Sequence, residues 1–207
     1  MLHRTARYLL AAIQGIIGWE WFMSGGNKLF SGQFPQGLAD TLNKGIVNNP
    51  NGWYVSILQH AIIPHSIFWG YSIEWTEIMI GLVLIGSAVL LLSGPRMPGE
   101  PQHRLGVIYC IATIVAAAMG AFQNINFHFW MGGWVIPTFD PSTPFNEGVD
   151  LDALLPLFFL TIIMANIALI QDLTGKKLFR RKTATTPSPA VVTTPVASND
   201  ARNAVGT

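Results

Sequence analysis

Four apolar segments, each long enough to cross a lipid bilayer, constrain the fold of this chain more than any other feature. A helix needs about 20 residues to cross a hydrocarbon core roughly 30 Å thick. Segments of this kind lie at residues 8–30, 72–92, 105–122 and 154–173. Half of the 207 residues are apolar and only 11% are charged, against about 25% charged residues in soluble domains. The sequence therefore predicts an all-α fold, a polytopic membrane four-helix bundle.

Basic residues predict how the bundle is oriented. They gather before the first segment, between the second and third, and after the fourth: Arg4, Arg7, Arg96, Arg104 and the run at 176–182. Because cytoplasmic loops carry an excess of Lys and Arg, both termini are predicted to be cytoplasmic, in a bacterial or archaeal membrane. The first segment resembles a signal peptide, but Gln14 interrupts it and no small-x-small cleavage site follows. It is therefore predicted to be an uncleaved first helix.

The two outer connections, residues 31–71 and 123–153, differ from ordinary loops. In the first, Leu38, Leu42 and Ile46 recur at helical spacing, and a second apolar stretch precedes Pro64. These patterns predict two short interfacial helices. The second connection has no helical period and is predicted to form a lid over the bundle. Residues 1–175 would be one transmembrane domain, and residues 176–207 a basic stop followed by a disordered cytoplasmic tail.

Three carboxylates, Glu20, Glu74 and Glu77, lie within or at the start of apolar segments. An ionised carboxylate at the bilayer centre costs at least about 2.5 kcal/mol, so such residues usually face a partner or a cavity. A helix rises about 1.5 Å per residue, which gives the height of each side chain above the predicted cytoplasmic end of its helix. These heights are about 30 Å for Lys28, about 28 Å for Glu74, about 24 Å for Glu77 and about 18 Å for Glu20. Glu20, Ser24 and Lys28 share one helix face, and Glu74 and Glu77 share another. The sequence predicts one polar niche in the outer half of the membrane.

Two interpretations of this niche remain open. In the first, Lys28 and Glu77 form a structural ion pair that orients two helices. In the second, the surplus carboxylates Glu74 and Glu20 accept protons or bind a quinol headgroup. Burial disfavours the charged form of a carboxyl group, which suits proton exchange with a redox partner. On the second interpretation Glu77, Lys28, Glu74 and Glu20 are the candidate catalytic residues.

A further set of polar residues is predicted at the same level of the membrane. These candidate cofactor-binding residues are His128, Asn124, Asn126, His60 and His65. A histidine there could hydrogen-bond a quinone carbonyl, ligate haem, or bond a backbone carbonyl. The sequence has no metal, flavin or haem motif, and its single cysteine, Cys110, excludes an intrachain disulfide or dithiol redox pair.

Three short motifs resemble the DoxX/DoxD family of four-helix membrane proteins. Gly25-Gly26-Asn27-Lys28-Leu29 is similar to that family's Gly-x-x-Lys-Leu signature, and residues 77–86 resemble its Glu-x-x-x-Gly-Leu-x-Leu-x-x-Gly pattern. Residues 124–128 resemble its Asn-x-Asn-Phe segment at the end of helix 3. The resemblance runs from about residue 4 to 175, and the long outer connections are closer to DoxD. It implies the membrane subunit of a thiosulfate:quinone oxidoreductase, which passes electrons to membrane quinone.

The resemblance also implies a partner. The chain has no motif that takes electrons from sulfur, so the chemistry would need an extracytoplasmic or membrane partner subunit. The alternative is a non-catalytic accessory subunit of a larger respiratory or photosynthetic complex. A transporter is a third interpretation, which the absence of a detectable inverted repeat disfavours. With a net charge of +1, nothing indicates a nucleic-acid partner.

Overall fold

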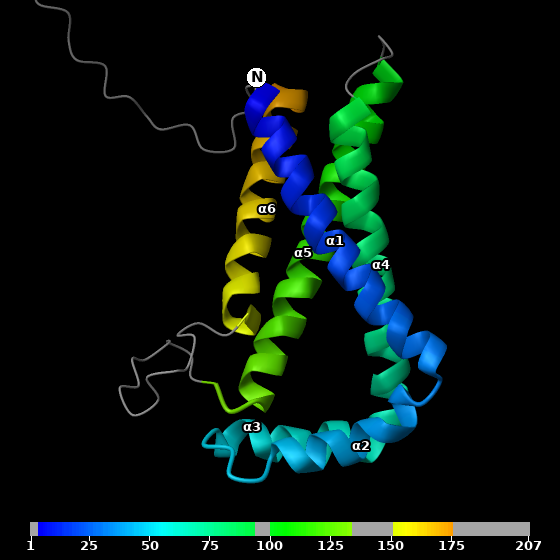
Figure 1. Cartoon of the computed structure of the whole chain (residues 1–207). Coiled ribbons are helices and arrows are strands. Elements are labelled where there is room, and N and C mark those ends of the chain that lie inside the picture. The colour runs from blue at the N-terminus through cyan, green and yellow to red at the C-terminus, as the bar shows by residue number, and fades with distance from the viewer. Residues whose placement is uncertain (1–3, 94–99, 134–150, 176–207) are drawn as a thin grey trace, which may run out of the picture. The chain divides into compact units, whose positions relative to one another are not determined.

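The computed structural model describes residues 4–93, 100–133 and 151–175, and the regular structure in these residues is helical throughout (Figure 1). Four long helices occur in this part of the chain: α1 (Arg4–Ser31), α4 (Ser66–Ser93), α5 (Glu100–Trp130) and α6 (Leu151–Thr174). Two shorter helices, α2 (Phe34–Gly45) and α3 (Gly52–Ile57), lie between α1 and α4. The all-α prediction is confirmed for these residues.

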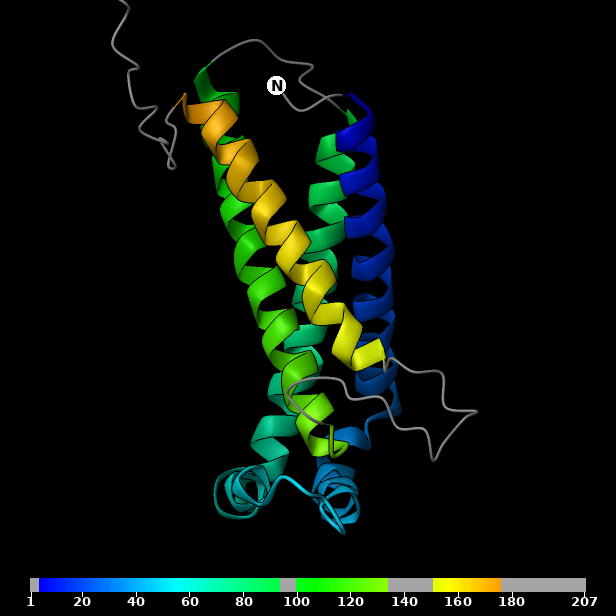
Figure 2. The same ribbon diagram turned by 90° about the vertical axis from the view of Figure 1, so that its left-hand side faces the viewer.

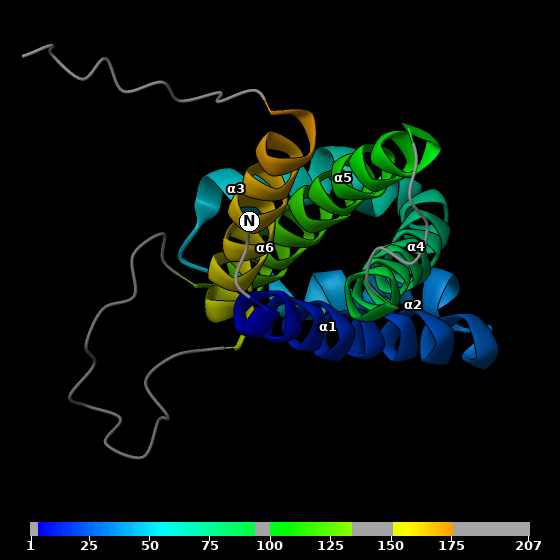
Figure 3. The same ribbon diagram turned by 90° about the horizontal axis from the view of Figure 1, so that it is seen from above.

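Small residues determine how closely α1 and α4 pack. The two helices are antiparallel neighbours (Figure 3). A Cβ atom built on Gly18 would lie 2.9 Å from the Leu84 Cβ, and one built on Gly81 would lie 2.5 Å from the Phe22 nitrogen. Side chains at these positions would therefore separate the backbones. At Gly86, also on α4, an added Cβ would meet nothing within 4 Å, so this glycine does not contribute to the close contact.

The helices α5 and α6 form a second antiparallel pair, in which Gly120 packs against the Phe159 ring and Gly106 lies beside Leu173. All four long helices contribute to one apolar core. Its buried residues are Leu10, Ile17, Trp21, Ile80, Leu84, Ala116, Ala117, Phe159 and Ile162. Within α1, α4 and α6 these residues are three, four or seven positions apart, so each of these helices presents one face to the core. The helix α5 contributes the adjacent residues Ala116 and Ala117.

The helices α2 and α3 lie across one end of the four long helices (Figures 1 and 2). Pro35 begins α2 and packs on Gly70 of α4, and Gly45 at its other end packs on Trp130 of α5. A small second core made by Leu38, Leu42, Tyr54 and Leu58 joins these elements. We call α2 and α3 together the end platform.

The end platform caps α5. Asn49 Nδ2 donates hydrogen bonds to the Phe129 and Trp130 carbonyls at 2.9 Å, and Asn51 Nδ2 donates to the Gly133 carbonyl at 2.8 Å. The last carbonyls of a helix have no partner within that helix. The Phe129 carbonyl also accepts a hydrogen bond from the Gly132 N–H at 3.1 Å, and the two asparagine amides add side-chain donors at this end. The platform is thereby fixed to the end of the helix that carries His128.

Some predicted boundaries were wrong. The third predicted segment, 105–122, continues as α5 to Trp130, and the second, 72–92, begins at Ser66. No loop separates the platform from α4, because a π turn at Leu58–Ile62 and a 3-10 turn at Ile63–His65 keep the backbone helical through Pro64. A proline has no N–H to donate, so the altered hydrogen-bond pattern accommodates it.

Within the described residues, three helices are long and apolar enough to cross a membrane: Gly52–Ser93, Arg104–Trp130 and Leu154–Thr174. The helix α1 is long enough, but it includes Arg4, Arg7, Glu20 and Lys28. The length and composition of the three helices indicate a membrane protein in contact with lipid. The central part of the predicted lid, 134–150, and the predicted tail, 176–207, lie outside the described residues.

Candidate functional site

An ion pair between α1 and α4 forms the centre of the site. Lys28 Nζ lies 2.6 Å from Glu77 Oε2 and donates a second hydrogen bond to Ser24 Oγ at 2.8 Å. The Glu77 side chain is 2% exposed and that of Lys28 is 22% exposed. The carboxylate is therefore inside the protein, and the ammonium group lies at the edge of the site. The spacings predict that Lys28 pairs with a carboxylate of the second apolar segment, and the structure shows that its partner is Glu77.

Glu74 lies one helical turn from Glu77 on the same face of α4 and is 1% exposed. It lies close enough to Lys28 and Glu77 to interact electrostatically with both. Among the described residues, no hydrogen-bond partner reaches Glu74 Oε1. A buried oxygen of this kind is uncommon in folded proteins and requires an explanation. Glu74, Glu77 and Lys28 together are called the acid niche below.

Gly25 makes the acid niche compact. A Cβ atom added at Gly25 would lie 2.9 Å from the Glu74 carbonyl oxygen and from the Glu77 Cβ. The absence of a side chain lets the α1 backbone contact the turn of α4 that carries both carboxylates. The platform covers the other side, where the Phe34 ring centroid lies 5.3 Å from Lys28 Nζ. An aromatic face at this distance stabilises an ammonium group.

Glu20 is not buried with the other carboxylates. It lies two turns from Lys28 along α1, on the same side as Ser24, and its side chain is exposed. The structure therefore brings together three of the four candidate catalytic residues. The spacing in the sequence places Glu20 on the same helix face as Ser24 and Lys28. It does not indicate that this face is exposed at Glu20.

Asn124 and Asn126 use their amide groups within α5. Asn124 Nδ2 donates to the Gly120 carbonyl at 3.1 Å, and Asn126 Nδ2 donates to the Phe122 carbonyl at 2.7 Å. Asn126 also accepts a hydrogen bond from the Tyr54 hydroxyl at 3.0 Å, which joins α5 to the platform. These contacts give both residues a structural role. Sequence reasoning missed Tyr54, whose only signal was an aromatic side chain in a predicted interfacial helix.

The histidines are spread apart. His60 and His65 are exposed on the turns that precede α4, and His60 Nδ1 lies 2.8 Å from the Ser56 carbonyl oxygen of its own turn. The His128 ring packs against Gly133 at the end of α5. Within the described ranges, no three His, Cys, Asp or Glu side chains are grouped as metal ligands.

A second group of buried polar residues was not predicted as a site. It consists of one residue from each long helix: Gln14, Ser87, Thr113 and Asn166. Gln14 precedes Gly15 and Ser87 precedes Ala88, and Gly15 and Ala88 face one another across the α1–α4 contact. Thr113 lies about two turns before Gly120, and Asn166 about two turns after Phe159, so both lie at one level of the α5–α6 pair. We call these four residues the inner polar layer.

Comparison with protein-family models, with curated proteins and with solved structures gives no match for this chain. The similarity to the DoxX/DoxD family therefore rests on the three short motifs. Two of those motifs contribute the residues of the acid niche, Lys28 from the first and Glu77 from the second. Family membership remains a prediction.

Proposed function

We propose that all four long helices cross the membrane, with both termini in the cytoplasm and the end platform at the outer surface. The distribution of basic residues supports this orientation. The length of α1, 28 residues, exceeds what a membrane crossing requires. On this arrangement the acid niche lies close to the outer headgroups, beneath the platform.

Within this arrangement the protein is a quinone-interacting subunit of an oxidoreductase, similar to the membrane subunit of thiosulfate:quinone oxidoreductase. The observation that carries the proposal is Glu74, a buried carboxyl group with an oxygen that lacks a partner among the described residues, beside a fixed cation. A quinone carbonyl or a quinol hydroxyl would supply the missing hydrogen-bonding group. Quinone would be the substrate that accepts the electrons.

The residues of the niche would have different roles. An ammonium group has three N–H donors, and Lys28 directs two of them to Glu77 and Ser24. The third can donate to a quinone oxygen, while Glu77 holds the ammonium group in place. Glu74 in its protonated form can transfer a proton to the second oxygen. Reduction consumes two electrons and two protons per quinone. Oxidation of two thiosulfate ions to one tetrathionate would supply the electrons, Glu74 would supply one proton, and water at the outer surface would supply the second.

The sulfur half of the reaction requires a partner subunit. Cys110 is buried, and the cations on the platform side that the structure describes are Lys28 and Lys44. Two lysines from separate elements do not form a convergent anion site. The membrane subunit would therefore receive electrons from a redox partner that binds at the outer surface.

Purification without added quinone tests the proposal directly. We expect the wild-type protein to retain quinone, and to reduce quinone with thiosulfate when the partner is supplied. Glu74→Gln should retain less quinone and lose turnover, while Asp40→Asn, which removes an exposed carboxylate from α2, should behave as wild type. A wild-type protein that retains no quinone and shows no thiosulfate-dependent reduction would remove this proposal.

The alternative function is that of an accessory subunit in which the acid niche is purely structural. The ion pair supports it, because a lysine and a carboxylate from two helices orient those helices without any chemistry. Glu77→Gln separates the two functions. An accessory subunit should still assemble with its complex and lose only modest stability, whereas a redox subunit should assemble and lose turnover.

A further inference from the structure

A groove runs along the outside of the α1–α4 pair, away from the acid niche. Its volume is about 400 Å³, and it is open along its length to the surroundings of the helices. Small residues line its centre: Ala11, Ala12, Gly15 and Ala88. Because these residues have little or no side chain, the two helices leave a channel between the larger residues on either side.

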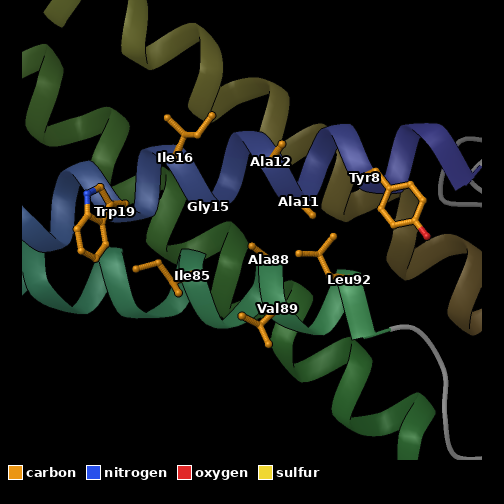
Figure 4. A pocket seen from close by; sticks show the side chains of 10 residues that line it. All are labelled: Tyr8, Ala11, Ala12, Gly15, Ile16, Trp19, Ile85, Ala88, Val89 and Leu92. Carbon is orange, nitrogen blue, oxygen red and sulfur yellow. The ribbon is translucent and has the colours of Figure 1, made fainter.

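The groove has defined ends. Tyr8 and Leu92 line one end, and Trp19 and Ile85 line the other (Figure 4). Along α1 the distance from Tyr8 to Trp19 is about 16 Å. The hydrocarbon of one leaflet is about 15 Å thick, half of the bilayer core. The groove is therefore as long as one leaflet of lipid chains, and its lining is apolar apart from the Tyr8 hydroxyl and the Trp19 ring nitrogen.

A cation lies at the Tyr8 end. Arg7 Nη2 donates a hydrogen bond to the Leu91 carbonyl at 2.9 Å, which fixes the guanidinium group beside the last turn of α4. Guanidinium groups have five N–H donors, and among the described residues Arg7 uses Nη2 for the Leu91 carbonyl, which leaves other donors for an anion. An apolar channel one leaflet long, with a partly exposed arginine at its headgroup end, matches a phospholipid that carries a net negative charge.

We propose that this groove binds one acyl chain of an anionic phospholipid, with the lipid phosphate at Arg7 and the chain end at Trp19. On the topology proposed above, the lipid belongs to the cytoplasmic leaflet, where anionic lipids are enriched. The inference goes beyond the proposed function, because the groove and the acid niche lie on different parts of α1. Lipid binding would stabilise the α1–α4 pair, which supports both halves of the niche.

Lipid analysis of the full-length protein, purified in mild detergent, tests the proposal. We expect the wild type to retain phosphatidylglycerol in preference to phosphatidylethanolamine. Arg7→Gln should lower this retention about fivefold, the effect of one basic residue at an anionic surface, and Arg7→Lys should restore most of it. Ala12→Phe should also lower retention, because Ala12 is exposed and lines the groove.

Gly86→Phe is the matched control, since it adds the same ring to α4 at a position with no neighbour within 4 Å and outside the groove. It should retain phosphatidylglycerol as the wild type does.

A second measurement keeps the test valid if a variant folds poorly. Added dioleoyl phosphatidylglycerol should raise the unfolding temperature of the delipidated wild type more than that of Arg7→Gln. The proposal would be overturned if the wild type retained both lipids equally, or if Arg7→Gln did not change the retention of phosphatidylglycerol. A dimer that Ala12→Phe dissociates, or a quinone that it displaces, would identify a different occupant and would also overturn it.

Discussion

Glu74 and Glu77 show how neighbouring carboxylates on one helix face acquire different environments. Glu77 has an ammonium group at 2.6 Å, whereas Glu74 Oε1 has no hydrogen-bond partner among the described residues. The three-residue spacing predicts that both face the same way, and it predicts a pairing with Lys28. It does not predict which of the two is paired, because that depends on how far α1 slides along α4, which the position of Gly25 determines.

The asparagines and histidines show the limit of residue-scale prediction. Their residue types are readable from the sequence, and their predicted level would fit a headgroup site. The partners of Asn124 and Asn126 are carbonyls one turn earlier in α5, a local choice that competes with any ligand. No pattern of spacing distinguishes an amide that bonds to its own helix from one that points into a cavity.

Gln14 provides a prediction at the residue scale. Its side chain is 0% exposed, and within the described structure neither its Nε2 nor its Oε1 has a hydrogen-bond partner. Gln14→Leu should therefore raise stability by about 1–3 kcal/mol, the penalty for a buried group left unsatisfied. Thermal unfolding in detergent measures this change.

Asn166→Leu is the control for that measurement, because it removes a hydrogen bond from Nδ2 to the Ile162 carbonyl at 2.8 Å. Asn166→Leu should not raise the stability of the protein as Gln14→Leu does. A lower unfolding temperature for Gln14→Leu would mean that the carboxamide has a partner, such as a bound water in the inner polar layer, and would contradict the prediction.

At the scale of elements, glycine positions explain why α1 pairs with α4. The helix α1 has two adjacent glycines, Gly25 and Gly26, of which only the first faces α4. A Cβ on Gly25 would lie 2.8 Å from the Ile78 nitrogen, whereas a Cβ on Gly26 would meet nothing within 4 Å. Small residues in a membrane helix indicate a close contact, but only the helix face decides which of two neighbours makes it.

Gly25→Ala should therefore destabilise the protein by about 1–3 kcal/mol, because the added methyl group meets backbone that cannot move away easily. Gly26→Ala should leave stability unchanged or raise it by up to about 1 kcal/mol, because alanine favours a helix more than glycine. The difference between the two unfolding temperatures measures the contact. Equal effects of the two substitutions would show that α1 and α4 are not packed through Gly25.

The extent of each element was less predictable than its existence. The four long helices follow from the length of the apolar segments, and the two platform helices from the helical spacing of Leu38, Leu42 and Ile46 and the apolar stretch before Pro64. The continuation through Pro64 does not, since proline usually ends a helix, and a π turn followed by a 3-10 turn is not encoded in any simple pattern. The extension of α5 to Trp130 depends on Asn49 and Asn51, which are distant in sequence and cap its end.

At the scale of the whole molecule, the proposed orientation can be tested with cysteine labelling. Cys110 is first replaced by alanine, and then a cysteine is introduced as Asn43→Cys on the platform or as Thr174→Cys at the end of α6. Both positions are exposed. A membrane-impermeant maleimide should label the first variant in intact cells and the second only after lysis. Labelling of the second variant alone in intact cells would reverse the topology and place the acid niche at the inner surface.

The unbroken helical path from α3 into α4 has a mechanical consequence. A flexible linker would absorb a displacement of the platform, whereas the hydrogen-bonded bend formed by the irregular turns would pass it on to α4. A protein that docks on α3 and tilts it by a few degrees would rotate the first turns of α4, and Glu74 lies in those turns. Docking on α3 would thereby change the geometry around the Glu74 carboxyl group through the irregular turns next to Pro64.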